Sequence, residues 1–208
     1  MKIKKLLIVI PLLFSSFISA DFRQGVDYRL VSSPLPVKKD GVVEVTEVFW
    51  YECAACYNFY PAINAWSIKQ DNTIKFSKMP VTWHETARNQ AALFYTIEAL
   101  GLGSEVQSSV FLQIHKERKM LRSPRQIQDF LKKFGVDKEK TTQYINSFSI
   151  KQRVERANKT IRQLQVQSTP TVIVDGKYII SPKRNLEEFF EVLDYVLSLI
   201  HISEPTRP

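Results

Sequence analysis

Two cysteines, Cys53 and Cys56, are the only cysteines in the chain, and two residues separate them. They follow residues 45–50, a run rich in β-branched and aromatic residues that predicts a strand. Where a strand turns into a helix, the first sulfur lies near unpaired backbone N–H groups and the helix dipole favours a thiolate. Because the second thiol lies about one helical turn further on, the spacing predicts a redox centre that performs thiol–disulfide exchange.

Two other uses of the cysteine pair are possible in principle. A purely structural disulfide is disfavoured because a bridge that closes so small a loop restricts the unfolded chain little. Zinc needs about four ligands, and the remaining His84, His115 and His201 do not have finger-like spacing, so we expect no metal. His84 follows a predicted strand and could border an active groove, whereas we expect His115 to be an ordinary, partly exposed helical residue.

The segments on both sides of the cysteines predict a β-α-β unit. Residues 41–50 and 73–81 predict strands, and residues 53–68 between them predict a helix. Apolar residues then recur at helical spacing in five segments, residues 89–100, 104–115, 123–134, 150–164 and 185–196.

The third of these helices has the clearest start, because Ser123, Pro124 and Gln126 match a capping box with proline at the first helical position. Before the last helix, two β-rich runs, residues 171–175 and 177–180, flank the pair Asp175-Gly176, which is a strong hairpin signal. The order is therefore β-α-β, then helices, then α-β-β-α.

This order, with the cysteines at the first strand-to-helix turn and Pro170 at the entry to the later hairpin, resembles the DsbA family of periplasmic thiol:disulfide oxidoreductases. The resemblance implies an α/β protein with a thioredoxin-like fold, in which an all-helical domain is inserted between the first βαβ unit and the C-terminal ββα unit. Residues 21–84 and 151–200 would form the thioredoxin-like domain and residues 85–150 the insertion. The similar segments are residues 22–28, 47–53, 121–123, 167–171 and 174–178.

The resemblance assigns roles to the two thiols and to the hairpin entry. Cys53 would be the exposed nucleophile that forms a mixed disulfide with substrate, and Cys56 would be the buried resolving thiol. Pro170 matches the family's cis-proline, whose loop pairs its backbone with bound peptide, so Thr169 and Pro170 would dock substrate. Without the resemblance, a trans proline that opens an edge strand would be the simpler interpretation.

Two glutamates flank the cysteines in sequence. Glu47 shares strand parity with Val45 and Phe49, so its carboxylate is expected to point among apolar side chains, where burial raises a carboxyl pKa. It matches a family acid thought to relay protons at the resolving cysteine; an exposed edge-strand position is the alternative. Glu52 is expected to face solvent and to disfavour the Cys53 thiolate slightly.

The chain departs from the family between the cysteines. Well-known members carry Pro-His there, and Ala54-Ala55 supplies neither a charge nor a side-chain donor. We therefore predict a less oxidising enzyme, with disulfide oxidation of exported polypeptides as its function and a reductase or isomerase role as the alternative. A chaperone that binds peptides without turnover is a further alternative, and its peptide-binding activity would survive replacement of both cysteines.

The first 20 residues resemble a cleaved secretory signal peptide, with three lysines, an apolar core and small residues before Ala20; an uncleaved anchor is the alternative. Export predicts the periplasm, where disulfides persist. Loss of these residues would lower the formal charge of +8 by three, to +5, and no motif that reads nucleic acid accompanies the scattered basic residues, so we expect no nucleic-acid partner.

The family further implies that the enzyme acts as a monomer with no cofactor beyond its Cys53–Cys56 disulfide. Its partners would be reduced exported polypeptides and, as reoxidant, a quinone-linked membrane protein resembling DsbB. The final segment, residues 197–208, resembles the translated read-through of a sequencing adapter, so we expect no biological role for His201.

Overall fold

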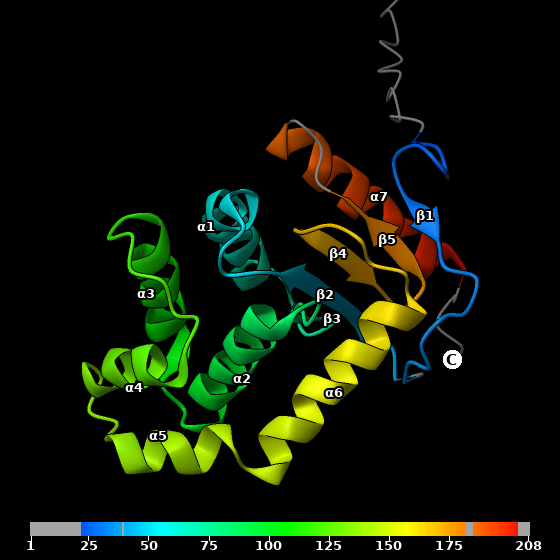
Figure 1. The fold of residues 1–208 in the computed structure, drawn as a ribbon. Coiled ribbons are helices and arrows are strands. Elements are labelled where there is room, and N and C mark those ends of the chain that lie inside the picture. The colour runs from blue at the N-terminus through cyan, green and yellow to red at the C-terminus, as the bar shows by residue number, and fades with distance from the viewer. Residues whose placement is uncertain (1–21, 39, 182–184, 204–208) are drawn as a thin grey trace, which may run out of the picture.

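The computed structural model describes residues 22–38, 40–181 and 185–203 (Figure 1). The expected signal peptide therefore lies outside the described residues, as do residues 204–208. No helix among the described residues is both long enough and apolar enough to span a membrane.

A five-stranded mixed sheet forms the centre of the molecule, and its strand order is β1-β5-β4-β2-β3. Strands β2 and β3 are parallel, while β4 is antiparallel to β2 and β5 is antiparallel to β4. Parallel neighbours need a crossover, which the helix α1 supplies. The strands are β1 (Arg29–Leu30), β2 (Val43–Phe49), β3 (Ile74–Pro80), β4 (Thr171–Val174) and β5 (Tyr178–Ile180).

Helices cover both faces of the sheet: α1 and α7 lie on one face, and α2 and α6 on the other (Figure 1). Helices α3, α4 and α5 pack beyond α2, so α2 to α5 and the start of α6 form the inserted helical layer. The helices are α1 (Ala54–Ile68), α2 (Glu85–Ala99), α3 (Gly103–His115), α4 (Pro124–Lys132), α5 (Lys138–Ile145), α6 (Phe148–Gln163) and α7 (Leu186–Ser203). This arrangement confirms the predicted thioredoxin-like fold with a helical insertion.

The α1 and α7 face of the sheet is packed by a continuous apolar cluster. Alternate residues of β2 and β4 point to this face, namely Val43 and Val45 on β2 and Val172 and Val174 on β4. Fully buried members of the cluster include Val45, Ile63, Val172, Val174, Phe189 and Leu193. The end of β2 and the first turn of α1, where the cysteines lie, pack in the other apolar cluster, which contains Val48, Phe49 and Cys56.

Several predicted local signals are confirmed. The Ser123 side chain accepts from the backbone N–H of Gln126 in a capping box. The α6 stripe of Ile150, Val154, Ala157 and Ile161 is buried. The predicted hairpin turn is also present, with φ of 51° at Asp175 and 58° at Gly176, and both positive values fit a type I′ turn.

Other elements differ from the expectation. Helix α5 was not predicted because its sequence is polar and buries only Thr141; it starts at the Asp137 cap. Helix α2 begins at Glu85, four residues before the predicted residue 89, because His84 caps it. Leu186 belongs to the apolar pattern that predicts the last helix, yet it is 44% exposed at the first turn of α7.

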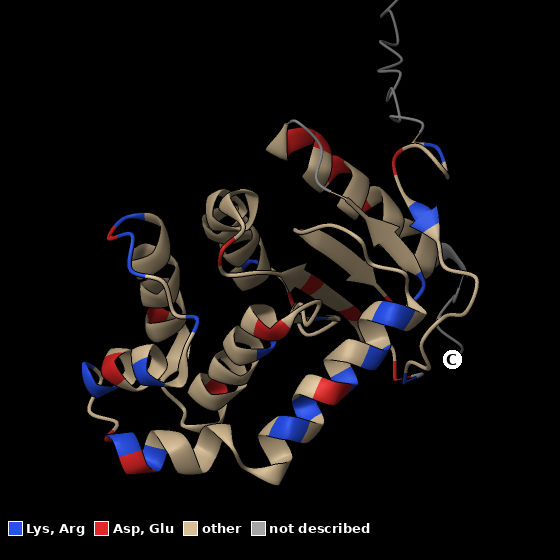
Figure 2. Ribbon diagram, in the orientation of Figure 1, with Lys and Arg blue, Asp and Glu red and all other residues tan. Residues whose placement is uncertain are grey.

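Basic residues recur along α6 (Figure 2), and Glu155 lies among them in the sequence. Two ion pairs join α6 to α2. Arg153 pairs with Glu98, and Glu155 pairs with Arg88 at 2.8 Å. Such pairs are typical of a solvated charged face.

Candidate active site

Cys53 is the N-cap of α1, at the point where the chain leaves β2. Its backbone N–H donates to the Trp50 carbonyl at 3.0 Å, which closes the turn between strand and helix. Its sulfur accepts the backbone N–H of Cys56 at 3.4 Å, so the thiol occupies the place of a capping side chain at the positive end of the helix. The predicted strand, turn and helix therefore place the first cysteine as expected.

The two thiols have opposite environments. Cys53 is partly exposed, and hydrogen bonding from Cys56 is the largest cause that lowers its pKa, to about 5, against the opposing effect of burial. Cys56 is fully buried, and desolvation raises the pKa of its thiol far above its usual range. At neutral pH the reduced pair consequently holds a thiolate at Cys53 and a neutral thiol at Cys56.

The loop before β4 lies against the first cysteine. The Cys53 sulfur lies 3.4 Å from the Thr169 carbonyl oxygen, which accepts a hydrogen bond from the thiol when Cys53 is protonated, although 116 positions separate the two residues. The Thr169–Pro170 peptide bond is cis, as predicted, Pro170 is buried, and the Thr171 hydroxyl braces the turn by donating to the Ser168 carbonyl at 2.9 Å. The expected docking residues thus border the Cys53 sulfur.

Glu47 lies in the interior strand β2 with only 1% of its surface exposed, so the alternative of an exposed edge position is wrong. Its neighbour in register on β3 is Lys78, whose Nζ donates to Glu47 Oε2 at 2.5 Å. Burial raises the pKa of Glu47, and the Lys78 charge opposes this. Glu47 Oε1 is buried without a hydrogen-bond partner, so the carboxyl retains one position for a proton or an acceptor contact.

Lys78 itself was not singled out from the sequence. It is 15% exposed along its side chain, and its Nζ lies 4.4 Å from the centre of the Tyr60 ring of α1. A cation held between a carboxylate and a ring face is stabilised by both. Strand parity alone could not have suggested this contact, because Lys78 is placed opposite Glu47 only by the parallel register of β2 and β3.

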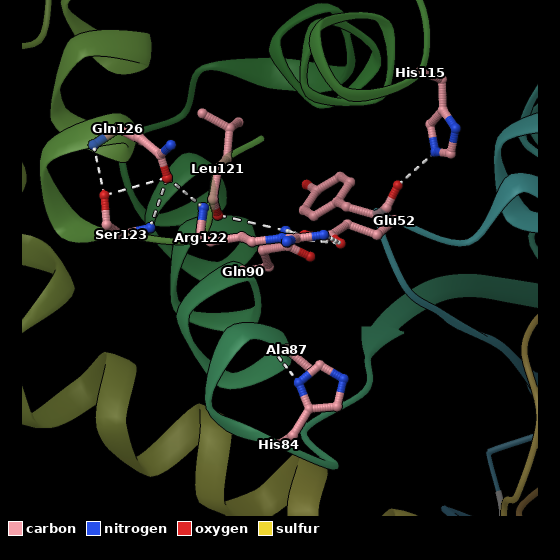
Figure 3. A network of polar contacts seen from close by, with 10 residues as sticks. Glu52, His84, Ala87, Gln90, His115, Leu121, Arg122, Ser123 and Gln126 are labelled. Atoms are coloured by element: carbon pink, nitrogen blue, oxygen red, sulfur yellow. Dashed lines mark hydrogen bonds and ion pairs between the residues drawn. The ribbon is translucent and has the colours of Figure 1, made fainter. Parts of the chain in front are cut away.

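The prediction for Glu52 is wrong: its side chain is only 9% exposed. Arg122 reaches it from the segment before α4 with a two-pronged ion pair, in which Nε lies 2.9 Å from Oε1 and Nη2 lies 2.6 Å from Oε2 (Figure 3). Gln90 of α2 donates to the same carboxylate at 2.8 Å. The hydrogen bonds from Arg122 are the main reason why the pKa of Glu52 lies below its usual range.

The sequence showed no pattern that joins these three residues. Gln90 and Arg122 lie 38 and 70 positions from Glu52, so local periodicity cannot relate them. Only the packing of the helical insertion over the end of β2 brings them together.

His84 and His115 contact the segments next to the cysteines. His84 accepts the Ala87 N–H at the start of α2, and its ring meets the Trp50 ring edge-on, with 5.2 Å between ring centres. His115 is partly exposed, as expected, but it has specific partners: its Nε2 lies 2.8 Å from the Tyr51 carbonyl and its ring stacks on Tyr57 at 4.7 Å.

Among the described residues, no group of three or more histidine, cysteine, aspartate or glutamate side chains is arranged to hold a metal ion. The arrangement can instead perform sulfur exchange, since it joins an accessible thiolate, a buried partner thiol and a buried carboxyl group.

Comparison with known proteins agrees with this chemistry. Residues 45–194 match the model of the DSBA-like thioredoxin domain. The chain is 39% identical over 179 residues to the thiol:disulfide interchange protein DsbA of Pseudomonas aeruginosa, covering 85% of both chains. It is 37% identical to the protein of the same name from Burkholderia cepacia, covering 85% of this chain and 84% of that one.

Solved structures are similar as well. The crystal structure of P. aeruginosa DsbA superposes with a TM-score of 0.82 at 37% identity, covering 88% of this chain and 96% of that chain. The oxidoreductase NmDsbA1 from Neisseria meningitidis has a TM-score of 0.77 at 22% identity, which shows a shared fold. From the match to the domain model and from these relatives, the chain belongs to the DSBA-like thioredoxin domain family of thiol:disulfide interchange oxidoreductases.

Proposed function

We propose that this protein is a periplasmic disulfide oxidase that donates its Cys53–Cys56 disulfide to pairs of thiols in exported polypeptides. One observation carries the proposal: the Cys53 sulfur lies at the amino end of α1 and contacts the Thr169 carbonyl, while Cys56 is fully buried behind it. An attacking substrate can therefore reach only one of the two sulfurs.

The first step is attack by a substrate thiolate on Cys53 Sγ of the oxidised enzyme. A substrate–Cys53 disulfide forms, the Cys53–Cys56 bond breaks, and its electron pair leaves on Cys56. Because burial strongly disfavours a thiolate at Cys56, this sulfur takes up a proton as it leaves. We assign that proton to Glu47, whose buried carboxyl has a raised pKa.

The second step releases the product. A second substrate thiolate attacks the substrate sulfur of the mixed disulfide, the substrate disulfide forms, and Cys53 leaves as a thiolate. A thiol of low pKa is a good leaving group, so the pKa of about 5 at Cys53 favours this step. The substrate pair has lost two electrons and two protons, and the enzyme is left reduced.

Substrate peptide would be held beside the sulfur by Thr169 and Pro170, which border it in the fold. The redox-active disulfide is the only cofactor in this proposal. A quinone-linked membrane partner resembling DsbB would reoxidise the enzyme, which acts as a monomer and without nucleic acid.

Two measurements on the purified protein test the proposal. The first is oxidation of a reduced, unfolded client protein by the oxidised enzyme, with recovery of client activity as the readout. The second is the equilibrium potential against glutathione. We expect stoichiometric client oxidation and an oxidising potential; a strongly reducing potential would instead indicate a reductase.

The chaperone alternative is separated by the variant Cys53→Ser/Cys56→Ser. We expect this variant to lose all client oxidation. If it suppressed client aggregation as well as the wild type and neither protein oxidised the client, the oxidase assignment would be wrong.

A further inference from the structure

The residue immediately before the reactive cysteine is a shielded carboxylate. Glu52 is 9% exposed and accepts from Arg122 Nε and Nη2 and from Gln90 Nε2, at distances between 2.6 and 3.2 Å (Figure 3). Every hydrogen bond that it receives comes from the helical insertion, although Glu52 itself lies between β2 and α1. A two-pronged contact of this kind fixes the relative orientation of both charged groups.

Arg122 is held in place by its backbone as well as by its side chain. Its N–H donates to the Gln126 side chain at 2.9 Å, which is the same side chain that completes the capping box of α4. Its carbonyl accepts from Asn89 of α2 at 3.1 Å. The backbone of Arg122 is thus anchored between two helices, while its side chain is 54% exposed and reaches over to the largely buried Glu52 carboxylate.

The Gln90 side chain helps to hold the Glu52 carboxylate in place. It is 1% exposed, and its Nε2 donates both to Glu52 and, at 3.4 Å, to the Leu121 carbonyl. A buried amide that donates to a carboxylate at this position keeps the carboxylate beside the start of α1 and away from bulk water.

A carboxylate next to a thiolate opposes its ionisation, since like charges raise the pKa of the neighbouring acid. Here the Arg122 cation neutralises that carboxylate. Among the described residues, Cys56 hydrogen-bonds the Cys53 sulfur, the Cys53 charge acts on Glu47, which is paired with Lys78, and His84 acts on the Glu52 carboxylate.

We propose that Arg122, through its ion pair with Glu52, is a positioning residue that keeps Cys53 readily ionised, and that the helical insertion thereby sets how oxidising the enzyme is. This inference rests on the proposed function. Because Ala54 and Ala55 carry no charge, the helical insertion would supply part of the charge balance around Cys53.

The charges predict shifts of opposite sign in two variants. Arg122→Met leaves the Glu52 carboxylate uncompensated, so the pKa of Cys53 rises and the enzyme becomes less oxidising. Glu52→Gln leaves the Arg122 cation uncompensated, so the pKa of Cys53 falls and the enzyme becomes more oxidising. We expect shifts of about half a pKa unit or more in each, and a double variant close to the wild type.

The test measures the Cys53 pKa from the pH dependence of thiolate absorbance and the equilibrium constant with glutathione in the wild type and in each variant. One pKa unit corresponds to a tenfold change in that constant, which is about 30 mV. Arg122→Lys keeps the charge but loses the two-pronged geometry, so it should retain most of the wild-type pKa. Glu155→Gln breaks a different ion pair between helices, the one with Arg88, and serves as the matched control.

Opposite shifts in the two single variants, with recovery in the double variant and in Arg122→Lys, support the proposal. Shifts in the same direction, or shifts no larger than that of Glu155→Gln, overturn it, because they would show a purely structural role. Folding of each variant is checked by its thermal transition, and Glu52→Gln is nearly isosteric. If the pKa shifts occur but the wild type oxidises no client, the proposed function fails while the charge balance stands.

Discussion

The sulfur of Cys53 lies 3.4 Å from the carbonyl oxygen of Thr169, a residue that follows it by 116 positions. This contact joins the two halves of the thioredoxin-like fold at the reactive atom. Cys53, the one thiol of the pair that is partly exposed, therefore lies at the loop that precedes β4. A peptide that reaches the Cys53 sulfur must also contact that loop.

Separate replacement of the cysteines should separate the two steps of exchange. Cys56→Ser keeps the accessible thiolate but removes the resolving thiol, so its mixed disulfides with client thiols should persist. Cys53→Ser should form none, because Cys56 is fully buried. The measurement is non-reducing electrophoresis after incubation with a client that carries an activated disulfide; equal adduct formation by both variants would be inconsistent with the assigned roles.

Glu47→Gln should slow release of Cys56 by removing its proton source. General acid catalysis contributes typically about 10²-fold to 10⁴-fold, so we expect at least a tenfold slower reaction at neutral pH. The measurement is the rate of mixed-disulfide formation by the oxidised enzyme. Lys78→Met serves as comparison: it should raise the Glu47 pKa further and keep the rate closer to that of the wild type. An unchanged rate in Glu47→Gln would remove this residue from the mechanism.

The reduced protein should owe part of its stability to the Cys53 thiolate, and this part should depend on pH. The folded pKa of about 5 lies below the usual value of 9.0, so the reduced folded state binds fewer protons than the unfolded state between these values. Stability from this group is therefore complete above the usual pKa and is lost as pH falls through about 5.

The oxidised protein has no such thiolate. On acidification from pH 8 to pH 4, the unfolding free energy of the reduced protein should therefore fall relative to that of the oxidised protein. The size of this fall should be roughly the integral of the linkage over that pH range. Denaturant titrations of both forms measure it, and a difference independent of pH would contradict an ionised Cys53.

Introduction of a histidine between the cysteines should make the enzyme more oxidising. Ala55→His adds a cation or donor beside the Cys53 thiolate and should lower the Cys53 pKa; each unit corresponds to about 30 mV if nothing else changes. The pKa of about 5 leaves room for this change, since it lies between about 7 in thioredoxin and about 3.5 in a strongly oxidising family member. Equilibration with glutathione measures the potential. An Ala55→Phe variant controls for side-chain bulk without a charge, and equal potentials in all three proteins would refute the interpretation of the Ala-Ala sequence.

The order of the elements and the placement of the cysteines could be predicted from sequence, because both depend on local signals. Strand-like runs end at turns, the Ser123 capping box starts α4, and Asp175-Gly176 closes the hairpin. The burial of Glu47 followed from strand parity. Helix α5 escaped prediction because its polar sequence has no apolar stripe, so only its packing reveals it.

The electrostatic surroundings of the site could not be predicted in the same way. Glu52 precedes Cys53 in sequence, yet its exposure depends on Gln90 and Arg122, which are distant in the chain. His115 likewise contacts Tyr51 only because α3 packs against the segment before the cysteines. Such contacts arise from tertiary packing of the helical insertion, for which a single sequence holds no local signal.

The account depends most on the difference between the two thiols, and alkylation of the native, reduced protein as a function of pH measures that difference directly. Peptide mass spectrometry would give the modification rate at each cysteine. We predict that Cys53 reacts with a midpoint near pH 5 and that Cys56 stays unmodified until the protein unfolds. Equal reaction of both cysteines, or reaction of Cys53 only above about pH 8, the range of an ordinary thiol, would contradict it.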